Sequence, residues 1–262
     1  VLYGALVAAR YGLRAAILTR ANLDRLDDTL RAQLDRLTAE VEIVSQASRG
    51  MTTFTNSEVA GRRSQILHDW GGEIDLNGLP PLWRSARAIH LAPVANEIDP
   101  RQVNRLAPQY LGCTPQGWLR RWDEDRLGKV RQVPLRLPAD LVTRIDAIVV
   151  SSEEYALSRE LVAEIGRRGL TAVTLGIQGA ALVDRGREVD LPAFRVPVID
   201  TVGAGDVFAA SLFAARSVRE SVSASARYAA AAAALTVRGA GIEFVPTREE
   251  VEDLIERGKR RS

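Results

Sequence analysis

Cysteine and histidine are almost absent from this sequence. Its 262 residues include one cysteine, Cys113, and two histidines, His68 and His90. A single cysteine excludes an internal disulfide framework and a multi-cysteine metal site. Two histidines likewise argue against a histidine-based zinc site.

Lysine is nearly as scarce, because Lys129 and Lys259 are the only two and arginine supplies the rest of the positive charge. Neither lysine stands in the pattern G-x-x-x-x-G-K-S/T, which excludes a P-loop kinase. The 35 basic and 33 acidic residues leave a formal net charge of +2. So balanced a charge gives no argument for nucleic acid or a membrane surface as a partner.

Apolar runs of transmembrane length and a signal-peptide pattern at the start are also missing from the sequence. We therefore expect a cytoplasmic protein with neither a membrane nor a nucleic-acid partner. The hydrophobic share of 46% over 262 residues supports a real core, in one large α/β domain or two small ones.

Helical and strand patterns alternate along the chain. Leucines at a spacing of three to four residues predict an amphipathic helix over 21–39. The other predicted helices cover 3–11, 158–168, 207–215 and 223–237, with a last helix capped by Thr247. The predicted strands are 14–19, 41–44, 51–56, 63–68, 87–92, 110–113, 146–150 and 171–175, followed by a hairpin of 180–183 with a second strand around Val189.

The most informative stretch runs from Val198 to Phe208 and reads VIDTVGAGDVF. An apolar segment stops at Asp200, a Gly-Ala-Gly turn follows, and a helix rich in small residues opens after it. Such a turn leaves the first N–H groups of the helix unpaired at the positive end of its dipole, and phosphate is the usual anion there. Asp206 places a carboxylate at the mouth of this anion site, which indicates phosphoryl transfer to a hydroxyl group.

Residues 200–206 match in full the signature D-T-x-G-A-G-D, and the sequence here resembles the ribokinase-like (PfkB) carbohydrate kinase family. Two structural interpretations compete. A dinucleotide-binding turn needs a third glycine where Phe208 stands, and an ordinary strand–turn–helix junction needs no ligand. The resemblance implies an α/β fold, a ribokinase-like three-layer sandwich with a largely parallel central sheet and a small β-lid. It covers residues 1–262 as a single domain.

The resemblance also implies roles for the signature and for the segments before it. Asp206 is expected to take the hydroxyl proton, while the backbone of Gly203, Ala204 and Gly205 holds the charge on the transferring phosphate. The expected ATP-binding residues are Ser151, Thr174, Gly176, Gly179, Thr201 and Gly241. A plain β-turn is the alternative for the glycines at 176 and 179.

The same resemblance implies binding sites for metal ions. The family places Asn-x-x-Glu after a strand, with the glutamate acting on Mg²⁺ through water; Glu154 fits this pattern and Ser151 replaces the Asn. The alternative for Glu154 is an acidic residue at a helix N-terminus, favoured by the dipole. The carbonyl groups of Asp200 and Val202 can take a monovalent cation such as K⁺, as in some relatives.

The acceptor side matches the family less well. The expected substrate residues are Tyr3, Thr53, Asn56, Gln116 and Arg120, each with a purely structural role as the alternative. Thr114 stands where related kinases often have Asp, although the glutamine and arginine beyond it are kept, a segment that looks most like the inositol-kinase branch. The three strands within about 41–70 resemble the lid that closes over the sugar, and its exposed edge can pair in a homodimer.

The helix over 3–11 is already in progress at Val1. Family members carry a first strand and a Gly-Gly turn before this helix, so we expect about 30 to 40 residues to be missing. The function expected is ATP-dependent phosphorylation of a hydroxyl on a sugar, an inositol or a related polyol. The alternatives are a non-catalytic nucleotide or sugar sensor on the same fold, and a nucleoside kinase.

Overall fold

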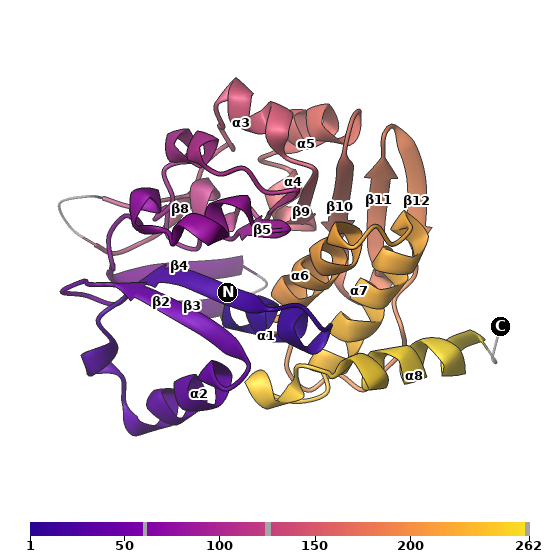
Figure 1. Cartoon of the computed structure of the whole chain (residues 1–262), viewed down its shortest axis with the longest axis horizontal. Helices are drawn as coiled ribbons and strands as arrows, with labels where there is room; N and C mark the ends of the chain where they lie inside the picture. The colour runs from indigo at the N-terminus through magenta and orange to yellow at the C-terminus, as the bar shows by residue number, and fades with distance from the viewer. Residues whose placement is uncertain (60–61, 124–126, 260–262) are drawn as a thin grey trace.

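The computed structural model describes residues 1–59, 62–123 and 127–259. At its centre lies a six-stranded sheet in the order β12-β11-β10-β9-β6-β5 (Figure 1). Its strands are β5 (Ala88–Leu91), β6 (Tyr110–Cys113), β9 (Ala147–Ser151), β10 (Leu170–Thr174), β11 (Ala180–Asp184) and β12 (Arg187–Leu191). The four strands from β5 to β10 pair in parallel, and the hairpin β11–β12 extends the sheet in antiparallel pairing.

Strand β9 shows why this sheet is the middle of three layers. Ala147 and Val149 pack into one apolar cluster while Ile148 and Val150 pack into another, because successive side chains of a strand point to opposite faces. All four are at most 4% exposed. Both faces of the sheet are therefore covered by helices, as the sequence predicts for parallel strands.

One face is covered by long helices rich in small residues. These are α6 (Ala204–Ser217) and α7 (Val222–Thr236); α1 (Leu2–Arg10) packs on α6, and α8 (Arg248–Lys259) packs on α7. Small side chains allow close approach, since a Cβ added at Gly4 would lie 3.1 Å from the Cβ of Ala210 on α6. A Cβ at Gly112 would lie 2.4 Å from the ring of Phe213, so α6 also sits tightly on the sheet. This packing fixes the start of α6 against α1.

The other face is covered by shorter helices and turns. The helices are α3 (Ala139–Arg144), α4 (Ser152–Tyr155) and α5 (Arg159–Gly166). The 3-10 helices among the described residues are η1 (Leu23–Arg25), η2 (Leu76–Gly78), η3 (Pro81–Ser85), η4 (Pro100–Arg105), η5 (Gln116–Leu119), η6 (Gly176–Gln178) and η7 (Ile242–Phe244). Helix α4 begins directly at the end of β9, which places its first turn at the carboxyl edge of the sheet.

The amino-terminal part forms a separate parallel pair, β1 (Ala15–Arg20) with β2 (Val41–Gln46), joined through α2 (Asp28–Thr38). The sequence grouped strand 41–44 with the lid strands, but its register pairs Val41 with Ala15 on β1. Helix α2 is also shorter than the predicted 21–39, because Asp27 caps it by accepting a hydrogen bond from the N–H of Leu30.

Strands β3 (Thr53–Val59) and β4 (Arg62–Asp69) form an antiparallel hairpin. The hairpin is joined to the segment that follows β7 (Arg120–Arg121) and precedes β8 (Arg131–Gln132). The N–H of Val130 donates to the carbonyl of Gln65 at 2.9 Å, and the N–H of Leu67 donates to that of Gly128 at 2.8 Å. Backbone pairing therefore holds the hairpin to the segment between β7 and β8.

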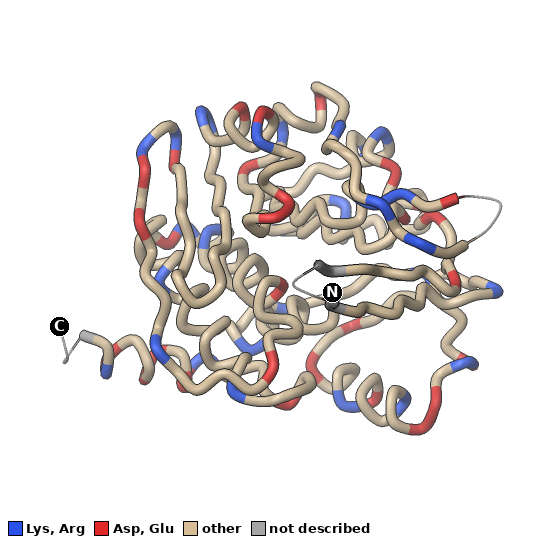
Figure 2. Tube along the Cα trace, turned by 180° about the vertical axis from the view of Figure 1, so that it is seen from behind, with Lys and Arg blue, Asp and Glu red and all other residues tan. Residues whose placement is uncertain are grey.

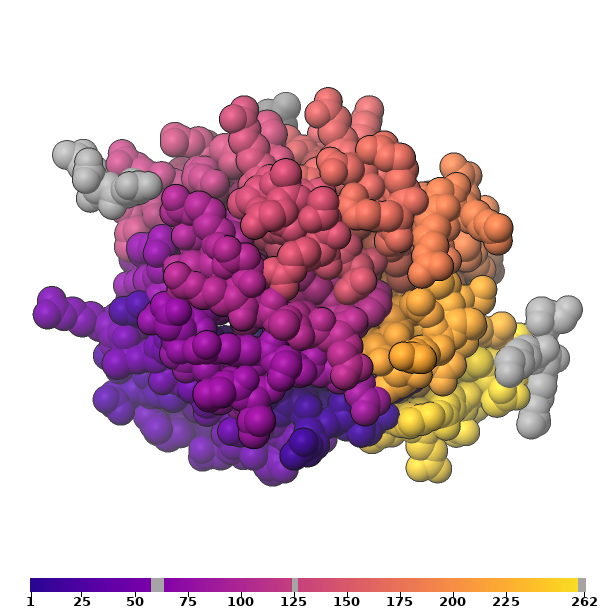
Figure 3. Space-filling view, turned by 45° about the horizontal axis from the view of Figure 1, so that its top comes forward, coloured from indigo at the N-terminus to yellow at the C-terminus, as the bar shows by residue number. Residues whose placement is uncertain are grey.

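The amino-terminal helices lie beside the segment that leads into α8, where indigo and yellow segments adjoin (Figures 1 and 3). Arg10 donates to the carbonyl of Val245, and Arg36 pairs with Glu243 at 2.8 Å. Acidic and basic residues are interspersed along the trace (Figure 2). Within the described ranges, no helix has the length and apolar character needed to cross a bilayer.

Candidate active site

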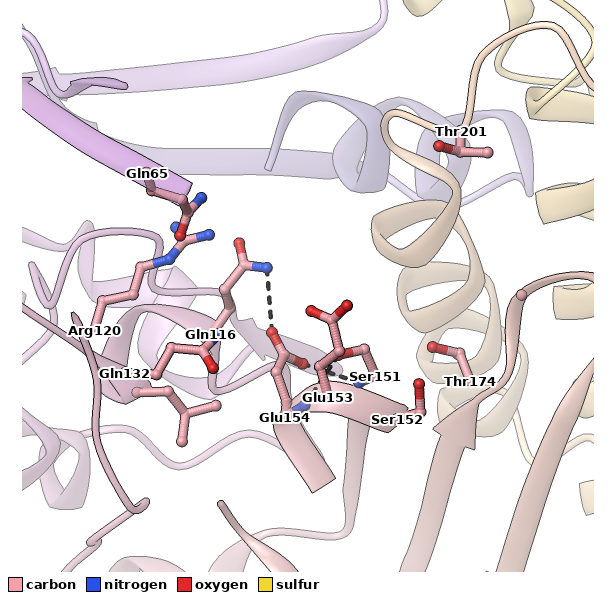
Figure 4. Close-up of a pocket in the computed structure, with 12 residues that line it drawn as sticks. Gln65, Gln116, Arg120, Gln132, Ser151, Ser152, Glu153, Glu154, Thr174 and Thr201 are labelled. Carbon is pink, nitrogen blue, oxygen red and sulfur yellow. Dashed lines mark hydrogen bonds between the residues drawn. The ribbon is translucent and has the colours of Figure 1, made fainter. Parts of the chain in front are cut away.

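A polar cavity of about 420 Å³ opens at the carboxyl ends of β9 and β10 (Figure 4). Its lining residues are Gln65, Gln116, Leu119, Arg120, Gln132, Ser151, Ser152, Glu153, Glu154, Thr174, Gly176 and Thr201. The carboxyl edge of parallel strands is where open α/β sheets bind ligands. Seven of the residues singled out from the sequence line this one cavity: Gln116, Arg120, Ser151, Glu154, Thr174, Gly176 and Thr201.

Glu154 is held at the cavity by the helix that carries it. Ser151 and Glu154 form a capping box: the Ser151 hydroxyl accepts the Glu154 N–H at 3.2 Å, and Oε2 of Glu154 accepts the Ser151 N–H at 2.9 Å. Oε1 of Glu154 accepts a further hydrogen bond from Nε2 of Gln116 at 3.2 Å. The serine that stands where the family pattern has asparagine therefore orients the glutamate.

The carboxylates of Glu153 and Glu154 suit a Mg²⁺ ion that is held chiefly by phosphate oxygens and water. In the part of the chain that the structure describes, no three His, Cys, Asp or Glu side chains cluster as a metal site. Mg²⁺ in phosphoryl-transfer sites keeps several waters and takes only one or two carboxylates. Glu153 and Glu154 are two such carboxylates on the cavity wall. The donor set therefore suits Mg²⁺ carried in with a polyphosphate.

The glycine loop leads into α6 as the sequence predicts, but the helix begins at Ala204 and not at residue 207. Gly203 is the N-cap residue with φ of +82°, a conformation that glycine adopts without strain. The ring of Tyr3 packs flat on it, since a Cβ at Gly203 would lie 2.4 Å from a ring carbon. A Cβ at Gly205 would meet no atom within 4 Å, so the space in front of this residue is open.

Asp206 lies in the first turn of α6 with 42% of its side chain exposed. The amino group of Val1 stands 3.4 Å from one carboxylate oxygen. Tyr3 is close enough that the charges of Asp200, Glu243 and Asp206, after the larger effect of burial, raise its pKa. The structure thus brings together the tyrosine and the two aspartates of the signature.

His90 lies beneath this region. Its Nε2 is 2.9 Å from the hydroxyl of Thr114, and its ring stands edge-on to Phe213 with centroids 4.9 Å apart. Burial lowers the pKa of His90 to about 4, although the charge of Asp206 opposes the shift. The imidazole is therefore neutral at physiological pH. The hydroxyl of Thr114, at the position where related kinases often carry Asp, pairs with this neutral ring.

Five of the expected residues have local structural contacts away from the cavity lining. Thr53 donates to the carbonyl of Met51 at 2.8 Å, and Asn56 accepts from Gln65 at 2.6 Å. Gly179 has φ of +97°, and a Cβ there would lie 2.0 Å from the carbonyl oxygen of Leu191. Two others show turn geometry: Gly241 has φ of +89°, and Oδ1 of Asp200 accepts from the N–H of Val202 at 2.9 Å.

Arg120 has a more buried position than its sequence context indicated. It is 5% exposed, donates to the carbonyl of Val94 at 2.6 Å and lies 5.1 Å from the ring centroid of Phe54 on the hairpin. Figure 4 shows Gln65 of β4 directed toward the Arg120 guanidinium. The arginine therefore connects the wall of the cavity to the hairpin that covers it.

Sequence reasoning missed Gln65, Gln132, Ser152, Glu153 and Leu119 as lining residues. Ser152 and Glu153 stand between two predicted site residues, so their place on the same short helix could have been inferred. Gln65 is brought in by the register of the hairpin, where it faces Asn56. Gln132 comes from a charged segment whose path no local pattern predicts.

Comparison with known proteins agrees with this geometry. The family described as pfkB family carbohydrate kinase matches residues 145–248. Fructokinase-1 of Zea mays is 30% identical over 210 residues, which are 75% of this chain, and a Haemophilus influenzae ribokinase is 28% identical over 96% of it. By these matches the chain is similar to the pfkB family of carbohydrate kinases. The match covers 85% of the Haemophilus protein's length and 60% of the maize protein's length. A Bacillus subtilis ribokinase is 39% identical over 84 residues, which are only 29% of its own length.

Solved structures place this chain in the ribokinase fold. A pyrophosphate-dependent kinase in the ribokinase family, in complex with sulfate, superposes with a TM-score of 0.79 at 19% identity, covering 96% of this chain and 90% of its own. A structure of such a kinase with a pyrophosphate analogue and myo-inositol gives 0.76 at 20% identity, with 96% and 89% covered. The ribokinase-like sandwich predicted from the sequence is thereby confirmed.

Proposed function

We propose that this chain is an ATP-dependent kinase that phosphorylates a hydroxyl of a sugar, an inositol or a related polyol. The observation that carries the proposal is the start of α6. There a glycine turn and Asp206 open a helix directly beside a cavity that Thr201 helps to line. Helix N-termini bind phosphate, and a bound phosphate repels a neighbouring carboxylate, so a carboxylate is expected beside it only where its chemistry is needed.

Asp206 would act on the acceptor. Its first-turn position favours the ionised form, and its exposure leaves it within reach of a hydroxyl group. In the step proposed, the acceptor oxygen bonds to the γ-phosphorus as the bond to the ADP oxygen breaks, and the hydroxyl proton passes to Asp206. Because such transition states are loose, the proton is needed only late and positioning carries most of the catalysis.

Backbone groups would carry the charge that develops on the phosphate. The N–H groups of Gly203, Ala204 and Gly205 lie at the N-terminus of α6, and the open space at Gly205 supports close approach of an oxyanion. Mg²⁺, when bound, would neutralise charge on the phosphates, with Glu154 and Glu153 as its protein-side partners. The carbonyls of Asp200 and Val202 are proposed for a K⁺ ion beside the loop.

The donor would lie along the cavity. Ser151, Thr174, Gly176 and Thr201 line it between the two carboxylates and the start of α6, which supports their assignment to ATP. Gly179 and Gly241 remain predictions for the same ligand. The pyrophosphate-dependent kinases named above have this fold, so inorganic pyrophosphate is a second donor to test.

The acceptor would lie between Tyr3, Asp206 and the hairpin. We propose the hairpin as the lid, because it is tied to the cavity wall and brings Gln65 to the lining. Thr53 and Asn56 on β3 are its proposed hydroxyl-binding residues, although both have partners within the hairpin. Pairing of two copies through the lid edge, and a location in the cytoplasm, where ATP and Mg²⁺ are supplied, belong to this proposal.

A non-catalytic nucleotide or sugar sensor is the second candidate. The changes at positions 114 and 151 favour it, since both depart from the family pattern. Both residues nevertheless have definite partners, because Thr114 pairs with His90 and Ser151 orients Glu154. The intact Asp206 and glycine turn therefore favour the enzyme.

The proposal is tested by measuring product release across a panel of sugars, inositols and nucleosides, with Mg-ATP and Mg-pyrophosphate as donors. Turnover on a sugar or polyol with ATP is the expected result, and pyrophosphate turnover alone would correct the donor. Phosphorylation of nucleosides alone would identify a nucleoside kinase instead. Tight ATP binding without turnover on any acceptor would contradict the enzyme and support the sensor.

A further inference from the structure

The carboxylate of Glu154 has a hydrogen-bond donor on each of its oxygens. One is the backbone N–H of Ser151 on the same short helix, at 2.9 Å. The other is the side-chain amide of Gln116, which comes from a separate segment 38 residues earlier in the chain, at 3.2 Å. Figure 4 shows both bonds converging on Glu154 at the cavity wall. The direction of this carboxylate is therefore set by two independent parts of the fold.

The segment that carries Gln116 is rigid. Its turn, η5, begins at this residue, and the next N–H, of Gly117, donates to the carbonyl of Pro93 at 2.8 Å. A Cβ at Gly117 would lie 2.5 Å from the carbonyl carbon of Pro93, so the two segments are in direct backbone contact. Trp118 is 2% exposed and donates through its indole to the carbonyl of Ile98 at 2.6 Å. A side chain on so firm a support is suited to orienting another group.

An amide is also the right chemical group for this task. A neutral N–H donor fixes a carboxylate without neutralising it, whereas a lysine or arginine at the same place would compete with a bound cation. Partners of metal-binding side chains usually donate hydrogen bonds in this way, and their loss typically lowers metal affinity about 10- to 100-fold. The sequence predicted that Gln116 contacts the acceptor, whereas its hydrogen bond to Glu154 indicates a role beside the metal.

We propose that Gln116 is a positioning residue that orients Glu154 toward the metal–nucleotide complex and makes no essential contact with the acceptor. This rests on the function proposed above, because it takes Glu154 as the residue that faces Mg²⁺. It assigns to Gln116 a role on the donor side of the reaction.

The test is calorimetric binding of a non-hydrolysable ATP analogue, with Mg²⁺ and with the metal chelated, so that no turnover is needed. Gln116→Leu removes the donor at similar size. Gln132→Leu is the matched control, because it removes an amide from the same cavity. We expect Gln116→Leu to weaken binding of the Mg²⁺ complex about 10-fold or more. Binding of the chelated nucleotide, and the KM for the acceptor, should stay within about twofold of wild type. Gln132→Leu should leave the difference between the two nucleotide forms unchanged.

Coupling to Glu154 completes the experiment. In a Glu154→Gln background the same change at position 116 should have almost no further effect on Mg²⁺-dependent binding, because the group that it orients is already lost. A raised acceptor KM with unaltered Mg²⁺ dependence would overturn the proposal and return Gln116 to the acceptor. Equal weakening in the two backgrounds would overturn it too. Wild-type protein that binds no Mg²⁺–nucleotide at all would instead overturn the proposed function, and this inference with it.

Discussion

His90 should make the stability of this protein sensitive to mild acid. Its folded-state pKa is about 4, because burial between β5, α1 and α6 disfavours the charged ring, whereas an exposed histidine titrates near about 6.5. Between these two pKa values His90 is protonated in the unfolded chain and neutral in the folded protein. Unfolding is therefore favoured as pH falls through this window, and the stability that His90 contributes is present in full above about pH 6.5.

The size of the effect follows from the two pKa values. At about pH 5 the unfolded histidine is almost fully protonated and the folded one mostly neutral, which costs about 2 kcal/mol of unfolding free energy relative to neutral pH. The assay is urea unfolding at a series of pH values for wild type and His90→Gln, since glutamine can keep a hydrogen bond to Thr114. Aspartates with lowered pKa, such as Asp69 and Asp99, act in both proteins and cancel in the difference.

We expect the stability difference between the two proteins to change by about 2 kcal/mol from about pH 7.5 to about pH 5, wild type losing more. A constant difference over that range would refute the reasoning. It would mean that the imidazole becomes protonated in the folded state without penalty, so that it is better hydrated or better paired with Asp206 than the structure indicates.

Two further predictions concern local structure at the site. Gly203→Ala should destabilise the fold and lower phosphoryl transfer by about 100-fold or more, because a methyl group there meets the ring of Tyr3 and the residue has positive φ. Gly205→Ala should lower transfer without loss of stability in urea unfolding, because its Cβ meets no protein atom but enters the space proposed for the oxyanion; equal destabilisation by the two changes would contradict this. Ser151→Ala should cost about 1 kcal/mol in urea unfolding through loss of the cap, whereas Ser152→Ala, at the next position, should cost a few tenths; equal costs would exclude the capping box.

The parts of the fold that sequence predicted well are those fixed by local chemistry. The turn at Gly203 could be predicted because few residues other than glycine adopt positive φ. The helix that follows the turn has a positive N-terminus, which typically binds phosphate. Strand β9 could be predicted because four consecutive apolar residues, closed by a polar serine, suit a strand buried on both faces. Such features need no knowledge of what packs against them.

Features that depend on pairing between distant segments could not be predicted from the sequence. The strand from Val41 has the same alternation whether it pairs with β1 or with a lid strand, so sequence could not choose its partner. Gln116 carries no mark that separates an acceptor contact from a bond to Glu154, 38 residues away. Gln65 enters the cavity only through the hairpin register. In each case the deciding information is tertiary contact.

The central claim is that Asp206 and the glycine turn transfer a phosphoryl group, and Asp206→Asn tests it most directly. The measurement is transfer of labelled γ-phosphate from Mg-ATP to the best acceptor, together with the dissociation constant of the nucleotide. We expect transfer to fall by about 100-fold or more while nucleotide binding changes little, because asparagine keeps the shape of the side chain but accepts no proton. Transfer within about threefold of wild type would contradict the account and remove Asp206 from the chemistry.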